Sequence, residues 1–214
     1  MKNITTTLSL LAVTALTSQA AISYTYSYDD APGFSSGIYE DDGAGFALTD
    51  TNTPFASGDL NDGVVYSGGN PVTDNGGATS MVAWNPAPGT PATITVDLGG
   101  LYDLSSVELT TYAFTAFNLG HPDDVTISTS VDNITYSGDQ LHSWVNPANG
   151  PALESIARTD TGIRYIQLEF DGNSHTGDKW GLTELAIEGT AVPEPSSTAL
   201  LGLGGLALIL RRRK

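Results

Sequence analysis

The segment ATITVDLG, at residues 92–99, alternates apolar and polar side chains and is the strongest indication of the fold. In an extended strand Ile94, Val96 and Leu98 would face one way, because successive side chains point to opposite faces. The same alternation recurs in SSVELTTY (105–112), DVTISTS (124–130), RYIQLEF (164–170) and LTELAIEG (182–189). We therefore expect each segment to form a half-buried antiparallel strand.

Turn-forming residues separate these segments, and no segment outside the two ends of the chain offers three turns of helical apolar periodicity. Asp132 and Asn133 suit a tight hairpin because both tolerate left-handed backbone conformations. The sequence therefore predicts an all-β protein, a jelly-roll β-sandwich over residues 22–190. We expect Trp84 and Trp180 to pack in its core.

The first 21 residues, MKNITTTLSLLAVTALTSQAA, have the layout of a secretory signal peptide. Lys2 precedes an apolar stretch at 8–16, and small residues follow at Ser18, Ala20 and Ala21. This order predicts export, with cleavage after Ala20 or Ala21.

The sequence ends in VPEPSSTALLGLGGLALILRRRK, at residues 192–214. The apolar run at 199–210 would span about 18 Å as a helix, against about 30 Å of bilayer hydrocarbon. This ending resembles a PEP-CTERM sorting signal over residues 191–214, with Pro193, Glu194 and Pro195 as its motif. The resemblance implies transient anchoring in the inner membrane, cleavage by an exosortase and delivery to the cell surface or extracellular matrix. A permanent single-span anchor is the alternative.

Acidic side chains dominate the region between these two ends. The chain has 24 acidic and 8 basic residues, and only Arg158, Arg164 and Lys179 are basic between the expected signals. Such a surface repels phosphate backbones and anionic lipids, so we expect no nucleic-acid binding. The absence of cysteine excludes disulfides and thiolate metal sites. Oxygen-ligated calcium is a candidate stabiliser, although a merely solvated acidic surface explains the charge as well.

Six phrases in a fixed order carry a resemblance to a known domain. They are LNDGVVYSGG (60–69), MVAW (81–84), TITVDLGGLYDLSSVEL (93–109), HPDDVTISTSVDNITY (121–136), RYIQLEF and WGLTELAIEG (180–189). Over residues 45–190 the chain resembles a discoidin, or coagulation-factor C-type, domain of the galactose-binding-like superfamily. The resemblance implies an eight-stranded jelly roll with a structural calcium ion, in which loops at one end recognise the ligand.

The resemblance also implies a set of calcium ligands. Carboxylates would come from Asp62 and Glu184, a hydroxyl or carbonyl from Ser67, and backbone carbonyls from Asp59, Val64 and Thr183. Calcium binds six to eight oxygens and accepts this mixture of donors. The alternative is that Asp62 belongs to an ordinary turn and Glu184 to an exposed strand.

Nothing in the sequence predicts catalysis. His121, His142 and His175 do not have the spacing of paired metal ligands, and there is no nucleophile elbow or phosphate-binding loop. With so many carboxylates, their number says nothing about a glycosidase pair.

Carbohydrate binding is the favoured function. Sugars are held by aromatic faces and by amides or imidazoles that bond their hydroxyl groups. The candidate ligand-binding residues are Tyr112, Asn118, His121, His142 and Trp144. Phe114 and Phe117 are expected to anchor their loop instead.

Two functions remain open at this point. In the first, a calcium-stabilised, lectin-like sandwich binds carbohydrate or exopolysaccharide at the cell surface. In the second, the domain is a structural or adhesive protein of the surface or biofilm matrix with no small ligand.

Overall fold

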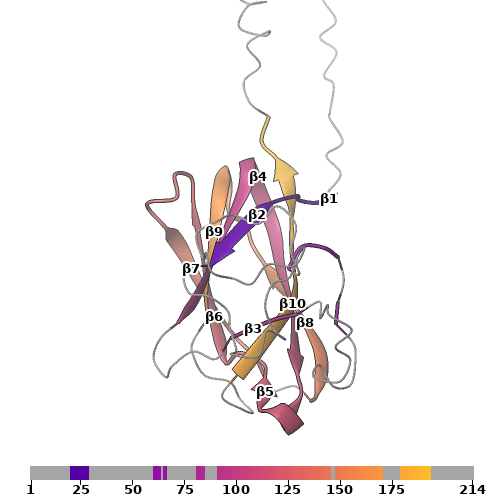
Figure 1. Ribbon diagram of the computed structural model, residues 1–214. Helices are drawn as coiled ribbons and strands as arrows, with labels where there is room; N and C mark the ends of the chain where they lie inside the picture. The colour runs from indigo at the N-terminus through magenta and orange to yellow at the C-terminus, as the bar shows by residue number, and fades with distance from the viewer. Residues whose placement is uncertain are drawn as a thin grey trace, which may run out of the picture.

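The computed structural model describes residues 20–28, 60–63, 65–66, 81–84, 91–145, 148–170 and 179–193, and these form a β-sandwich (Figure 1). The strands are β1 (Ala20–Ala21), β2 (Thr25–Tyr28), β3 (Val82–Trp84), β4 (Ala92–Ala113), β5 (Leu119–Gly120), β6 (Asp124–Ser130), β7 (Ser137–Ser143), β8 (Gly150–Ala157), β9 (Ile163–Phe170) and β10 (Lys179–Ala191). A short 3-10 turn, η1 (Thr115–Phe117), follows β4. No helix within these residues is long and apolar enough to cross a membrane.

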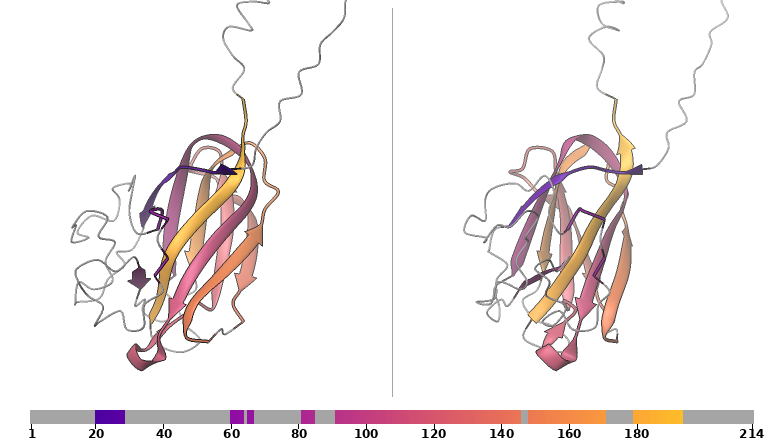
Figure 2. Two further views of the ribbon diagram at one scale, coloured as in Figure 1. Left: turned by 90° about the vertical axis from the view of Figure 1, so that its right-hand side faces the viewer. Right: turned by 45° about the vertical axis from the view of Figure 1, so that its right-hand side comes forward.

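Strand β4 belongs to both layers of the sandwich. Its first half pairs with β2 and β9, and its second half pairs with β8 and β10. The strand turns between the layers at Gly99, whose φ of +72° is open to glycine at little cost. The Gly99 amide also donates a hydrogen bond to Asp97 at 2.8 Å. A single strand therefore fixes how the two layers meet, as Figure 2 shows.

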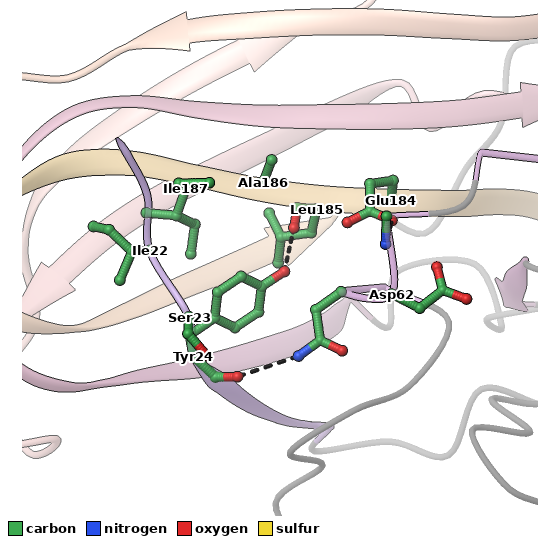
Figure 3. Close-up of a pocket in the computed structure, with 11 residues that line it drawn as sticks. Ile22, Ser23, Tyr24, Asp62, Glu184, Leu185, Ala186 and Ile187 are labelled. Carbon is green, nitrogen blue, oxygen red and sulfur yellow. Dashed lines mark hydrogen bonds between the residues drawn. The ribbon is translucent and has the colours of Figure 1, made fainter. Parts of the chain in front are cut away.

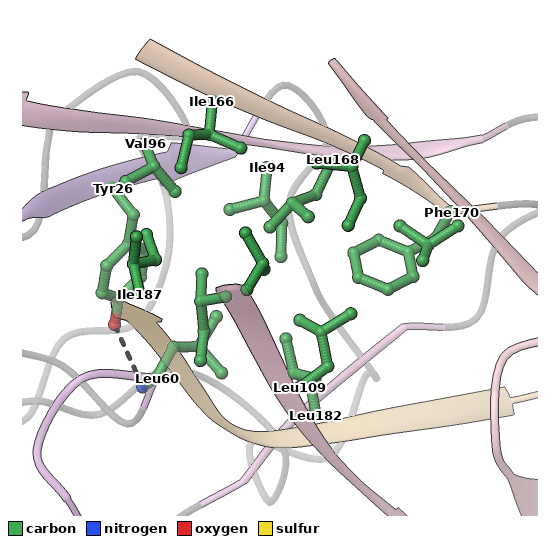
Figure 4. Packing of buried hydrophobic residues seen from close by; sticks show 14 of the residues in the cluster. Tyr26, Leu60, Ile94, Val96, Leu109, Ile166, Leu168, Phe170, Leu182 and Ile187 are labelled. Carbon is green, nitrogen blue, oxygen red and sulfur yellow. Dashed lines mark hydrogen bonds between the residues drawn. The ribbon is translucent and has the colours of Figure 1, made fainter. Parts of the chain in front are cut away.

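The two layers enclose one apolar core. The layer β2-β4-β9-β6-β7 faces the layer formed by β8, the second half of β4 and β10, and β1, β3 and β5 add to β10. Buried side chains from both layers meet between them, among them Ile94, Ile166, Leu109 and Leu182 (Figure 4). Burying each such side chain contributes roughly 1.5–3 kcal/mol. The alternation that predicted the strands therefore places their apolar faces in the core.

A row of aromatic rings runs through this core. Successive rings from Tyr26 to Phe170 lie 4.3–5.6 Å apart in the order Tyr26, Tyr28, Trp84, Trp180 and Phe170. Trp84 and Trp180 stack at 4.3 Å because β3 and β10 pair at these two positions. The prediction that both tryptophans pack in the core is confirmed.

Arg158 joins the edge strand β7 to the end of β8. It is only 5% exposed, and its guanidinium donates to the carbonyls of Ile127 and Gly138, to the Gln140 amide oxygen and twice to Asp160. These contacts, at 2.7–3.2 Å, use all five of its N–H groups. Burial favours the protonated form of Asp160, but the bonds and charge of Arg158 outweigh it and lower the pKa of the carboxyl. Asp160 therefore stays ionised.

Several expectations differ from the structure. The described residues form ten strands where the resemblance implied eight: β1, β3 and β5 are short pairings of two or three residues, and β4 joins two segments that were expected as separate strands. The expected tight hairpin is a longer turn between β6 and β7, in which Asp132 accepts backbone bonds from Ile134 and Thr135. Ala20 and Ala21 pair with β10, and the expected cleavage after Ala20 or Ala21 stays a prediction. The rest of the expected signal peptide and the apolar run at 199–210 lie outside the described residues.

We expect Arg158→Met to lower the free energy of unfolding by about 3–5 kcal/mol, because it strips a partly buried carboxylate and two carbonyls of their donor. The matched control is Arg164→Met. Arg164 makes a bidentate pair with Asp97, at 2.8 and 2.9 Å, but its side chain is 41% exposed. That loss should cost no more than about 1 kcal/mol. Urea unfolding measures both, and equal losses would contradict the role assigned to Arg158.

Candidate functional site

The turn at residues 60–63 is fixed against β10. The Leu185 amide donates to the Leu60 carbonyl at 2.8 Å, and Leu60 itself is buried. The Tyr24 hydroxyl lies within bonding reach of the carbonyls of Leu60 and Leu185, and Asn61 donates to the Tyr24 carbonyl at 3.2 Å. Burial, and secondly the charge of Glu184, raise the pKa of Tyr24 well above its usual range. Tyr24 therefore remains a neutral donor.

Glu184 is positioned by a β-bulge. The register of β10 on β4 shifts between Leu182 and Glu184, so Thr183 turns inward and donates to the Thr110 carbonyl at 3.1 Å. Glu184 then accepts a bond of 3.0 Å from the amide of Gly63, whose φ is +79°. A bulge commonly redirects a side chain in this way. The bulge and the glycine turn together hold one carboxylate over the turn.

Asp62 and Glu184 line one pocket of about 460 Å³, together with Ile22, Tyr24 and Ile187 (Figure 3). Carboxylates and backbone carbonyls are hard oxygen donors, which suit calcium and not zinc. Within the described residues no three His, Cys, Asp or Glu side chains form a metal cluster. The donors present thus fit calcium only if carbonyls complete the set. Asp59, Val64 and Ser67 lie outside the described residues.

A second candidate region lies around η1, at the end of the sandwich where β10 begins. Asn118 follows η1 and is exposed, with a φ of +54°. Its backbone amide donates to the Thr115 carbonyl at 3.2 Å. Asn149 accepts from the Thr115 amide and donates to the Thr115 hydroxyl, both at 3.1 Å. This two-way bond joins the η1 loop to the residues that precede β8.

His121 reinforces the same junction from inside the protein. Its Nδ1 lies 2.6 Å from the Thr111 hydroxyl, and its Nε2 lies 3.5 Å from the Ala148 carbonyl. Because a carbonyl can only accept, we assign the proton to Nε2, and Nδ1 accepts from Thr111. His121, which directly follows β5, therefore links Thr111 of β4 to Ala148 in the loop before β8.

The structure gives the five predicted ligand residues different surroundings. Tyr112, His121 and Trp144 are buried, so their side chains pack inside the domain. Tyr112 packs edge-on against Tyr66 at 4.9 Å, and Trp144 packs against His142 at 5.2 Å. Asn118 is exposed, and His142 is partly exposed with its Nε2 3.4 Å from Glu154 of β8.

The expected loop anchors are only partly visible. Phe114 is half-buried and packs against the small cluster around Tyr112, whereas the side chain of Phe117 and all of His175 lie outside the described part of the chain. Asn149, Thr115 and Tyr24 were not predicted. The sequence around Asn149 has no periodicity or motif, and no sequence pattern singles out Tyr24.

We expect Tyr24→Phe to destabilise the protein by about 1–2 kcal/mol, because it removes the buried donor that links the turn to β10. The control is Tyr136→Phe. The Tyr136 hydroxyl bonds Asn133 in the exposed β6–β7 turn, so its loss should change stability by less than about 0.5 kcal/mol. Thermal unfolding at matched pH measures both. A Tyr24→Phe protein as stable as the parent would show that this hydroxyl does not hold the turn.

Comparison with known proteins gives one sequence match and several structural likenesses. Residues 191–214 match the PEP-CTERM protein-sorting motif. No curated protein matches the chain as a relative. Similar solved structures include the C-terminal domain of a chitobiase from Bacteroides fragilis, with 19% identity over 56% of this chain and 78% of the other and a TM-score of 0.43.

Two further structures are carbohydrate-binding modules. Chitosan-binding module 1 of a chitosanase/glucanase from Paenibacillus sp. IK-5 shares 18% identity over 78% of this chain and 96% of its own, with a TM-score of 0.44. The CBM32 of AlyQ, solved with 4,5-unsaturated mannuronic acid, shares 24% identity over 53% of this chain and 80% of its own, with a TM-score of 0.40. Likenesses of this size do not determine what the present domain binds. The sorting motif does indicate an exported protein that an exosortase processes and that is sorted to the cell surface.

Proposed function

We propose that the sandwich binds carbohydrate of the cell-surface or extracellular matrix through the loops at its η1 end. The observation that carries this proposal is the locked junction of Thr115 with Asn149. A loop pair that is already ordered loses little conformational entropy when a ligand binds. Its exposed amide groups, on Asn118 and Asn149, are donors and acceptors for sugar hydroxyls.

The charge of the domain supports the same class of ligand. The two arginines of the sandwich are both paired with carboxylates, Arg158 with Asp160 and Arg164 with Asp97. The many remaining carboxylates repel polyanions, so a neutral or cationic glycan fits this surface best. We assign no catalytic step to it.

We also propose that calcium stabilises the domain at the pocket of Asp62 and Glu184. The two carboxylates would offset the charge of the ion, and the carbonyl of Thr183 would bind beside them. Asp59, Val64 and Ser67 would complete the set. The bulge at Thr183 and the Gly63 bond to Glu184 support this placement.

A structural or adhesive role without a small ligand is the second candidate. The burial of Tyr112, His121 and Trp144 favours it, because neither the tyrosine nor the tryptophan among the predicted contacts is left as an open platform for a sugar.

Retention on an array of neutral and cationic glycans tests the binding function. Asn118→Gly keeps the positive φ but removes the exposed amide, so we expect at least about a tenfold loss of affinity, equal to about 1.4 kcal/mol, with an unchanged melting temperature. Asn133→Gly is the matched control, since Asn133 also has a positive φ, of +61°, but lies in the β6–β7 turn. If the full chain binds no glycan, with or without calcium, the structural role stands instead.

Thermal unfolding tests the calcium proposal. We expect calcium added to chelated protein to raise the melting temperature by several degrees, because saturation at 100 times the dissociation constant contributes about 2.7 kcal/mol. Glu184→Gln should abolish the rise. Glu188→Gln, four residues further along β10, should keep it, because Glu188 accepts instead from Ser106. An unchanged melting temperature on adding calcium to the parent would refute the site.

A further inference from the structure

Both ends of the described sandwich meet at one end of the fold. Ala20 pairs with Gly189 and Ala21 with Glu188, and the Ile22 amide donates to the Ile187 carbonyl at 2.8 Å. Ala20, at the start of β1, therefore lies beside the end of β10, as Figures 1 and 2 show. We call this the terminal end; the η1 loop lies at the other end.

Close packing holds the terminal end together. A Cβ on Gly189 would lie 2.5 Å from the Asp103 carbonyl and 3.2 Å from the Ile22 side chain, so only glycine fits between β4 and the first residues. Beyond β10, the Val192 amide donates to the Leu101 carbonyl at 2.9 Å. The sorting segment thus begins from a fixed point on the β4 bend.

The terminal end also carries exposed apolar side chains. Leu101 on the β4 bend is 39% exposed, and Val131 and Ile134 in the β6–β7 turn are 59% and 83% exposed. The turn lies at this end because Ser130 pairs with Tyr165, which in turn pairs with Asp97 just before the bend. Exposed apolar tips of this kind suit contact with another apolar phase.

The charges at the terminal end are partly balanced. Both arginine pairs, Arg158 with Asp160 and Arg164 with Asp97, lie there. Asp103 accepts from the Gly162 amide, and Asp132 remains a charged group in the same turn as Ile134. Such a surface suits zwitterionic lipids better than anionic ones.

The tether to the membrane is short. Seven residues, 192–198, lie between Ala191 and the start of the apolar run at residue 199, and the eight Cα-to-Cα steps across them cover at most about 28 Å of extended chain. The 13 residues of β10 span about 40 Å towards the η1 end. The terminal end must therefore stay close to the bilayer while the sorting tail is attached.

We propose that the terminal end is the membrane-facing surface of the tail-bearing protein, and that Leu101, Val131 and Ile134 rest on the lipid surface. The η1 end then points away from the bilayer. This arrangement leaves the proposed glycan-binding loops accessible before the tail is removed, but it does not depend on glycan binding.

Energy transfer from single labels to lipid headgroups tests this orientation. Because the chain has no cysteine, Thr161→Cys at the terminal end and Ala116→Cys in η1, both exposed, each give one labelling site. The full chain is reconstituted in phosphatidylcholine vesicles with acceptor-labelled headgroups. We expect transfer at residue 161 to be at least about twice that at residue 116, given the extra length of the sandwich. Equal transfer, or stronger transfer at 116, would overturn the proposal.

The contribution of the apolar side chains is tested separately. Adding Val131→Ser and Ile134→Ser to the Thr161→Cys chain should reduce transfer at 161, because the tether alone allows the domain to tilt. The matched control is Leu141→Ser and Leu153→Ser, which removes exposed apolar side chains from β7 and β8. If energy transfer at residue 161 does not fall, or falls equally in the control, the proposed lipid contact is overturned. The orientation set by the tether is tested by the first measurement.

Discussion

The structure depends first on the passage of β4 from one layer to the other. Its two halves hydrogen-bond to different partners, β2 and β9 before Gly99 and β8 and β10 after Leu101, so its bend sets the geometry of both layers. The core fills the space between the layers, and Trp84 and Trp180 stack within it from the paired strands β3 and β10. β7 and β8 do not pair in the described structure, and Arg158, which directly follows β8, instead donates hydrogen bonds to Gly138 and Gln140 of β7. The Arg158 side chain thus joins two strands that have no backbone hydrogen bonds between them.

Local patterns predicted the parts of this fold that depend on local chemistry. The alternation in RYIQLEF and DVTISTS predicted β9 and β6 nearly to the residue, because half-buried strands require it. The continuity of β4 was not predicted, since the residues after Gly99 look like a loop between two strands. The pairing of Ala20 and Ala21 with β10 was missed for a similar reason, because an apolar leader gives no sign of a strand.

The candidate sites also divide into residues that local sequence identifies and residues whose surroundings depend on distant segments. Residue type suggested Asn118 and the family resemblance implied Glu184, and both are partly or fully accessible. Residue type also suggested His121 and Trp144, which are buried because imidazole and indole rings serve equally well as packing groups. Burial depends on contacts between distant segments, such as His121 with Ala148, and sequence periodicity does not carry that information.

The two ends of the sandwich have different chemistry. The terminal end gathers the chain ends, both arginine pairs and the exposed Ile134, whereas the η1 end presents amides on loops fixed by Thr115 and Asn149. Hydrogen exchange with and without a retained glycan tests this assignment most directly. The account predicts slower exchange of the amides around Thr115, Asn118 and Asn149, with none of that change at Val131 or Ile134. Protection confined to the terminal end, or no protection with bound glycan, would contradict it.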